Sequence, residues 1–157
     1  TSEPVVNHVM SLKTPVDRLI YNIFVSILGY KQPRMFQIES VRSVVYEHKD
    51  LLLIRKTGEG KSAVLQGSVC ARNGISICVT PLLGLTAQQS LSMEFLIDKG
   101  VFTFDVDTMS TYAKDRLIKL LYSFRELTDF ECMGLANLVL FCSPLILSKG
   151  KDYCLVF

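Results

Sequence analysis

The chain has 157 residues, of which 49% are hydrophobic and 20% are charged, and its formal net charge at pH 7 is +2. This length and apolar content suffice for one domain with a full hydrophobic core, and they exclude a disordered tail. Because basic and acidic residues nearly balance, composition alone does not indicate a nucleic-acid binder, and any such surface must be local.

Cysteine spacing and hydropathy restrict the environment of the chain. The five cysteines lie far apart and lack the paired spacing of zinc or redox sites, which predicts buried thiols in a reducing compartment. No apolar run reaches the ~18–20 residues of a membrane span, and the start of the chain lacks a signal pattern. We therefore expect a cytoplasmic or nuclear protein without a membrane partner.

The first part of the chain is predicted to be helical. Residues 1–13 show little periodicity and are expected to form a loose lead-in, with the folded domain at residues 14–157. A helix should begin after Thr14, whose hydroxyl is a good N-cap, with Pro15 in its first turn and Gly29 at its end. A second amphipathic helix is predicted to extend to about Glu47.

Between these two helices lies a segment that carries an aromatic ring, an arginine and an amide: Tyr30, Arg34 and Gln37. A surface turn with a partly buried Tyr30 explains this segment equally well when it is taken alone. The same residues also suit a purine site, because a ring can stack on the base and an amide can donate and accept along the adenine edge.

A glycine-punctuated loop follows an apolar run at residues 51–54, which is predicted to be a buried strand. The residues of this loop are Thr57, Gly58, Glu59, Gly60, Lys61 and Ser62. The glycines permit tight turns that let backbone amides converge on a phosphate, Lys61 supplies a positive charge for the β- and γ-phosphates, and the Ser62 hydroxyl can bind Mg²⁺. Helix-compatible residues follow Ser62, so the loop should lie at a helix N-terminus, where bound anions are favoured.

Two residues of this segment depart from an ideal phosphate loop. Arg55 stands where the full pattern has a glycine, and Glu59 places a carboxylate beside a site for anions. We expect the Glu59 side chain to point outward. An ordinary strand, turn and helix with a surface lysine is the alternative interpretation.

A second strand, loop and helix follow. Residues 75–80 are predicted to form a strand that is broken at Pro81, with a helix from about Leu83 to Ile97. Ligand sites in open parallel sheets gather beyond the carboxyl ends of strands, so residues 80–85 should emerge at the same edge as the phosphate loop. Hydroxyls and amides there can bind phosphate oxygens without reading base sequence, although a plain connection is the alternative. These side chains are Thr80, Thr86 and Gln89.

The remaining elements complete an alternating pattern. A strand is predicted at residues 101–106, a helix from Ser110 or Thr111, and a buried strand at residues 137–142 that ends at Ser143-Pro144. Strands and helices in this order predict an α/β fold, with a parallel sheet, helices on both faces and right-handed crossovers.

Several of these segments together resemble the successive motifs of RecQ-like superfamily 2 DNA helicases, over roughly residues 16–157. They are Gly29-Tyr30, Pro33-Arg34 and Gln37, then residues 56–62, then residues 80–85 with Gln88-Gln89, then Ser143-Pro144. The resemblance implies a RecA-like P-loop NTPase lobe that binds ATP and Mg²⁺ and couples ATP hydrolysis to translocation and unwinding. It implies stacking of Tyr30 on adenine, polar contacts to the base from Arg34 and Gln37, and catalysis that depends on Lys61. The residues that it implies on the backbone of single-stranded or partly duplex DNA are Thr80, Pro81, Leu82, Leu85 and Gln89.

The chain departs from that family near its end. The family has Thr-Pro-Glu where this chain has Ser143-Pro144-Leu145, and no Asp-Glu pair follows any apolar strand. Residues 152–157 look like the beginning of the strand that would precede this pair. We therefore expect a lobe that is incomplete at its C-terminus, with the acidic motif and the second motor lobe missing, and little or no hydrolysis by residues 1–157 alone.

Two other functions stay open. Residues 56–61 are also similar to the loop of SecA-type protein-translocation ATPases, although that family does not explain Tyr30, Arg34 or residues 81–85. A catalytically inactive nucleotide-binding remnant is the other alternative, and the departures at Arg55, Glu59 and Leu145 keep it open.

Overall fold

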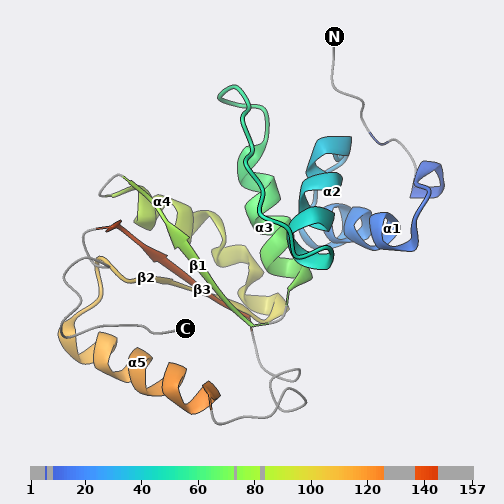
Figure 1. Cartoon of the computed structure of the whole chain (residues 1–157). Helices are drawn as coiled ribbons and strands as arrows, with labels where there is room; N and C mark the ends of the chain where they lie inside the picture. Colours follow the sequence, from blue (N-terminus) through green and yellow to red (C-terminus); the bar gives the residue numbers. More distant parts are fainter. Residues whose placement is uncertain (1–5, 7–8, 73, 82–83, 126–136, 145–157) are drawn as a thin grey trace. The chain divides into compact units, whose positions relative to one another are not determined.

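The computed structural model describes residues 6, 9–72, 74–81, 84–125 and 137–144 (Figure 1). The chain forms two compact units, Thr1–Arg72 and Asn73–Phe157, which we call unit 1 and unit 2. The described part of unit 1 is helical and carries the glycine-rich loop, whereas unit 2 contains the sheet. None of the helices within the described ranges combines the length and the hydropathy that a membrane span requires.

Both predicted helices of unit 1 are confirmed. Helix α1 (Pro15–Asn22) begins after Thr14, whose Oγ1 accepts a hydrogen bond from the Asp17 amide at 3.1 Å, and Pro15 occupies the first turn. It continues as a π-helical turn, η2 (Ile23–Ile27). In the same way, α2 (Met35–Val41) continues as the π-helical turn η3 (Arg42–Tyr46), and α3 (Lys61–Ala71) follows the loop.

Two residues of the predicted loose lead-in, Val6 and Leu12, are packed into the core. The 3-10 turn η1 (Val9–Ser11) lies between Val6 and Leu12, whose side chains are 5% and 1% exposed. Both side chains belong to the same hydrophobic core as Ile20 and Phe24. Isolated apolar residues have no periodicity, so the sequence pattern could not show that they are anchored in a core.

Phe24 lies in this core with 0% of its surface exposed. The ring of Tyr30 meets it edge-on, with 5.8 Å between the ring centroids. On the neighbouring helix α3, a Cβ added to Gly67 would lie 2.8 Å from Phe24 Cζ. Glycine inside a helix costs about 1 kcal/mol relative to alanine, and here it allows α3 to approach the ring closely.

A partly buried ion pair joins α1 to the turn that follows α2. Arg42 Nη1 lies 2.6 Å and 2.7 Å from the two carboxylate oxygens of Asp17, and Arg42 Nε lies 3.3 Å from Glu47 Oε1. Asp17 is buried, so its charge requires a partner of this kind.

The strand predicted for residues 51–54 is wrong. These residues have no regular secondary structure, and Leu52 and Ile54 are 85% and 80% exposed. Leu53 alone of the four packs against the core. A strand satisfies its backbone groups by pairing with another strand, and the described part of unit 1 offers no strand for this purpose. The glycine-rich loop therefore follows an exposed, unpaired segment.

Unit 2 contains a parallel sheet of three strands in the order β1-β3-β2. The strands are β1 (Ile75–Val79), β2 (Val101–Asp105) and β3 (Asn137–Cys142), as predicted. Leu140 of β3 stands in register with Ile77 on one side and Phe104 on the other. All six residues of the central strand β3 are buried, which explains its continuous apolar sequence.

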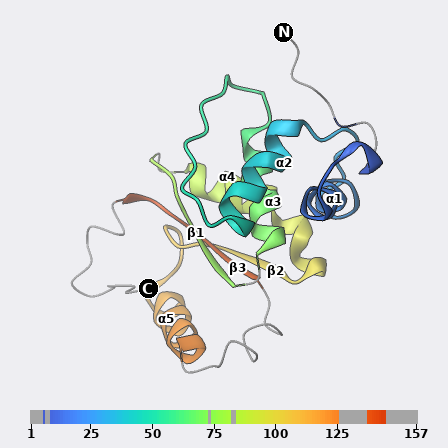
Figure 2. The same ribbon diagram turned by 45° about the vertical axis from the view of Figure 1, so that its right-hand side comes forward.

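Helices cover both faces of this sheet, as Figures 1 and 2 show. Helix α5 (Thr111–Arg125) packs against one face, where its Leu117 and Leu121 join the apolar side chains of β3. On the opposite face, Ser90 of α4 (Leu85–Ser92) donates a hydrogen bond to Thr103 Oγ1 of β2 at 3.2 Å. The long helix predicted after residue 83 ends at Ser92, and a separate 3-10 turn follows, η4 (Glu94–Lys99). The predicted α/β class with a parallel sheet is thus confirmed.

Candidate phosphate-binding loop

Two glycines in the loop before α3 have left-handed backbone conformations. Gly58 has a φ of +83° and Gly60 a φ of +85°, conformations that side chains with a Cβ rarely adopt. Gly60 is also the N-cap of α3, so the loop leads directly into the helix. The two glycines thus allow the chain to reverse within a few residues and enter a helix.

The first turn of α3 presents free backbone amides. No side chain caps this helix, and the amides of Lys61 and Ser62 make no hydrogen bond to any part of the chain that the structure describes. Unpaired amides together with the helix dipole favour an anion at this position. The donors required by a bound phosphate are therefore available here.

Lys61 adds a positive charge at the same end of α3. Its Nζ donates hydrogen bonds to the carbonyl oxygens of Arg55 at 2.9 Å and of Lys56 at 2.7 Å. Backbone carbonyls are weaker partners for an ammonium group than phosphate oxygens, which carry a full charge. The lysine is thus held over the loop by contacts that a bound phosphate can replace.

Glu59 does not point outward, and that expectation is wrong. Its Oε2 accepts a hydrogen bond from the Lys56 amide at 3.1 Å, and its own amide donates to the Lys56 carbonyl at 3.4 Å. An exposed amide three residues earlier in a tight turn is a nearby donor for a carboxylate, which explains this inward conformation. The Glu59 carboxylate therefore already occupies one backbone amide of the loop, that of Lys56.

Gln37 connects α2 to the loop and is buried. Its Nε2 donates to the Gly60 carbonyl at 3.1 Å, while its Oε1 accepts from the Arg34 amide at 2.9 Å. Both ends of this amide thus bond to backbone, one of them in the loop itself. Arg34, the other polar residue predicted to contact a base, contributes its backbone amide to this arrangement and has a half-buried side chain.

Tyr30 connects to α3 through a residue that the sequence analysis did not single out. Its hydroxyl donates a hydrogen bond to Gln66 Oε1 at 3.1 Å, and burial raises the pKa of Tyr30, so the hydroxyl stays protonated as a donor. The structure thus brings Tyr30 and Gln37 to the helix and the loop of the candidate site. Gln66 follows Lys61 by five residues, and no spacing rule connects it with a tyrosine 36 positions earlier.

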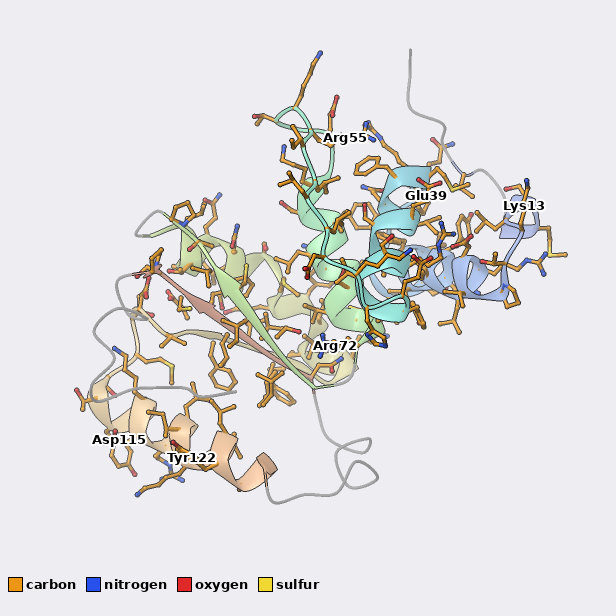
Figure 3. All side chains as sticks on the ribbon, in the orientation of Figure 1. Lys13, Glu39, Arg55, Arg72, Asp115 and Tyr122 are labelled. Carbon is orange, nitrogen blue, oxygen red and sulfur yellow. The ribbon has the colours of Figure 1, made fainter. Side chains whose placement is uncertain are left out.

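Arg55, which replaces a glycine of the loop pattern, packs against α2. Its guanidinium carbon lies 4.4 Å from the centroid of the Phe36 ring, and Figure 3 shows the side chain near this helix. A guanidinium over an aromatic face is a favourable contact. The arginine at this position thus attaches the start of the loop to α2.

The residues present fit a phosphate group better than they fit a metal ion alone. The Ser62 side chain is exposed and its hydroxyl can act as a ligand for Mg²⁺. Within the described ranges, no group of three or more histidine, cysteine, aspartate or glutamate residues is arranged to hold a metal. Ser62 is thus a residue of the loop that could hold Mg²⁺ together with the oxygens of a phosphate group.

Alanine substitutions at Gly60 and Gly58 separate the cost of a left-handed backbone conformation from the cost of losing the Gln37 hydrogen bond. A Cβ at Gly60 would lie 2.6 Å from Gln37 Nε2, whereas a Cβ at Gly58 meets none of the described residues within 4 Å. Both Gly60→Ala and Gly58→Ala carry the left-handed penalty of about 1–2 kcal/mol. Gly60→Ala should lower the free energy of unfolding of unit 1 by about 1 kcal/mol more, because it also breaks a hydrogen bond of Gln37. Urea denaturation of the two variants measures this difference, and equal losses would contradict the Gln37 contact.

The segment predicted to contact DNA lies in unit 2, and its hydroxyls are buried. Thr80 is 3% exposed, its Oγ1 has no hydrogen-bond partner among the described residues, and its amide donates to the Cys142 carbonyl at 2.9 Å. Pro81 is exposed, whereas Leu85 and Gln89 are half-buried. Leu82 lies outside the described residues. A DNA contact of this segment stays a prediction, and Thr80 does not offer its hydroxyl at the surface.

A carboxylate at the same edge of the sheet was not singled out from the sequence. Asp107 follows β2, and its Oδ1 accepts hydrogen bonds from the Ser143 amide at 3.0 Å and from Ser143 Oγ at 3.1 Å. Its Oδ2 accepts from Thr86 Oγ1 of α4 at 3.5 Å. Asp107 thus fastens the ends of β2 and β3 to the first turn of α4. The three residues are distant in sequence, so only the folded chain shows that they form a cluster.

The described cysteines are free thiols; Cys142 is buried as predicted, whereas Cys70 and Cys78 are half-buried. Burial raises the pKa of the Cys70 thiol to about 11, so this thiol stays protonated at neutral pH. Burial also raises the pKa of Cys78 and Cys142, with a smaller contribution from the charge of Asp107 at Cys142. These three thiols therefore do not offer a reactive thiolate. Cys132 and Cys154 lie outside the described residues.

No model of a known protein family matches the chain. The case for a function therefore depends on the chemistry of the loop and the residues around it.

Proposed function

We propose that the chain binds ATP through residues 56–62, as the ATP-binding part of a RecQ-like DNA helicase with a RecA-like lobe. One observation carries the proposal: the free amides of Lys61 and Ser62 lie behind a left-handed Gly60, at the end of α3 that also bears the Lys61 ammonium. Amides, helix dipole and cation together supply what a phosphate chain needs.

Each residue near the loop has a role in this proposal. Lys61 exchanges the Arg55 and Lys56 carbonyls for phosphate oxygens, and the Ser62 hydroxyl is a ligand for Mg²⁺, which supplies charge neutralisation when bound. Gln37 holds the loop through Gly60, and Tyr30 presents its ring for base stacking. Because Tyr30 also bonds to α3, base and phosphate recognition share one helix.

The proposed nucleic-acid contact has weaker support, from the start of α4. This helix also follows a left-handed glycine, Gly84 with a φ of +86°, and within the described part of the chain no side chain caps its N-terminus. It begins just beyond β1, at the carboxyl edge of the parallel sheet, where ligand sites of such sheets gather. Exposed Pro81 and Gln88 flank this turn. These features suit contacts to the phosphates of single-stranded DNA.

One observation favours the alternative of a catalytically inactive remnant. The Glu59 carboxylate occupies the Lys56 amide in a loop that is proposed to bind anions. If the chain never binds ATP, this contact serves to close an ordinary surface turn.

Calorimetric titration of the whole chain with ATP and Mg²⁺ tests the proposal. We expect saturable binding with a Kd between about 1 µM and 1 mM, the usual range for enzyme substrates. Pyrophosphate should compete with ATP, because the contacts seen in the loop are directed at phosphate. No saturable signal up to about 1 mM ATP would reject the proposal and leave the inactive remnant. A fluorescently labelled single-stranded oligonucleotide tests the DNA contact separately, and its affinity should fall as salt is raised.

A further inference from the structure

The loop satisfies its own polar groups through a set of short internal contacts. The Lys56 amide donates to Glu59 Oε2 at 3.1 Å, and the Lys56 carbonyl accepts from the Glu59 amide at 3.4 Å and from Lys61 Nζ at 2.7 Å. The same Nζ also bonds to the Arg55 carbonyl. The Glu59 carboxylate and the Lys61 ammonium group thus both bond to the backbone of the loop itself.

Glu59 stands out among these groups because its charge is opposite to the one that the loop requires. The residue is half-buried and lies between the two left-handed glycines, close in sequence to the free amides of Lys61 and Ser62. A phosphate that approaches these amides meets the negative charge of the Glu59 carboxylate. It also competes for an amide, that of Lys56, which the carboxylate already occupies.

We propose that Glu59 is an internal competitor for the phosphate site, which lowers the affinity of the loop for anions and selects against phosphate chains that carry no metal ion. This inference rests on the proposed nucleotide-binding function. Repulsion between Glu59 and a ligand grows with the negative charge of the ligand. A triphosphate with bound Mg²⁺ carries less negative charge than the free triphosphate, so Glu59 penalises it less.

The size of the effect follows from the partial exposure of the side chain. Solvent weakens the interaction of exposed charges, and the Glu59 side chain can swing away from an incoming ligand. We expect Glu59→Gln to tighten the binding of metal-free pyrophosphate by about 3-fold to 10-fold. The gain for ATP with Mg²⁺ should be smaller, below about 3-fold.

Glu59→Gln is the sharpest variant, because glutamine keeps an oxygen that can accept from the Lys56 amide and removes only the charge. Glu39→Gln is the matched control: Glu39 is exposed on α2, and the change in net charge is the same (Figure 3). Calorimetry of the wild type and of both variants with pyrophosphate in a chelator-containing buffer, repeated with ATP and Mg²⁺, gives the six affinities that are needed. Circular dichroism shows whether each variant is folded.

The outcomes separate this inference from the proposed function. Tighter pyrophosphate binding by Glu59→Gln but not by Glu39→Gln supports the inference, and so does binding that appears only in Glu59→Gln. If wild type binds ATP and Glu59→Gln binds pyrophosphate with unchanged or lower affinity, the inference fails and the proposed function stands. An equal gain in both variants also overturns it, since net charge then explains the effect. If neither the wild type nor Glu59→Gln binds any phosphate ligand, both proposals fail together.

Discussion

Replacing Lys61 by alanine is expected to weaken ATP binding by about 10-fold to 100-fold. A hydrogen bond between charged groups contributes about 1.5–3 kcal/mol, and the ammonium group of Lys61 is the cation nearest to the free amides in sequence. In the folded chain this ammonium bonds to two backbone carbonyls, those of Arg55 and Lys56. Its removal should therefore cost little stability, because the exposed Lys56 carbonyl and the partly buried Arg55 carbonyl can bond to water instead. Calorimetric titration with ATP measures the effect directly.

Lys13→Ala is the control for the loss of a positive charge. Lys13 is exposed before α1 in the same unit, and the two variants have the same net charge (Figure 3). We expect wild-type affinity for ATP from this control. If Lys61→Ala keeps wild-type affinity, or if both variants lose affinity equally, the loop is not the phosphate site that we propose.

Phe24→Ala is expected to lower the free energy of unfolding of unit 1 by about 3–5 kcal/mol. Truncation of a fully buried aromatic side chain loses its apolar burial and leaves a cavity. The surroundings of Phe24 are poorly able to close that cavity, because Gly67 has no side chain that could move into it. The contact with the Tyr30 ring would also be lost. Urea denaturation followed by far-ultraviolet circular dichroism reports the loss.

Leu19→Ala is the matched control for Phe24→Ala. Leu19 is an apolar residue of α1, the helix that continues into the turn containing Phe24, but its side chain is 53% exposed. Its truncation should cost less than about 1 kcal/mol, as is usual for surface positions. Comparable losses in the two variants would show that the core is not centred on Phe24.

Local signals in the sequence were sufficient for most helices and strands. The hydroxyl of Thr14 followed by Pro15 marks a helix start in any context, and the structure contains that start. The apolar run at residues 137–142 became the buried central strand. The run at residues 51–54 has a similar composition and did not become a strand. A strand depends on a partner elsewhere in the chain, and apolar composition does not show whether that partner is present.

The candidate site was predictable where its chemistry is local. The spacing of Gly58, Gly60 and Lys61 placed the loop at the start of a helix, and both glycines have the positive φ that such a loop needs. The contact of Tyr30 with Gln66 was not predictable, because it joins two elements whose packing depends on the whole core. The inward conformation of Glu59 was missed for a different reason, since a rotamer choice leaves no pattern in the sequence.

The close fit of Gly67 against Phe24 has a mechanical consequence for unit 1. Helix α3 cannot slide or tilt at this point without driving its backbone into a ring that is itself enclosed by the core. Helix α3 is therefore held in place, and it cannot shift when a ligand binds at Lys61. Any movement on ligand binding must therefore take place in the loop before α3, where Gly58 and Gly60 give the backbone the rotational freedom of a hinge.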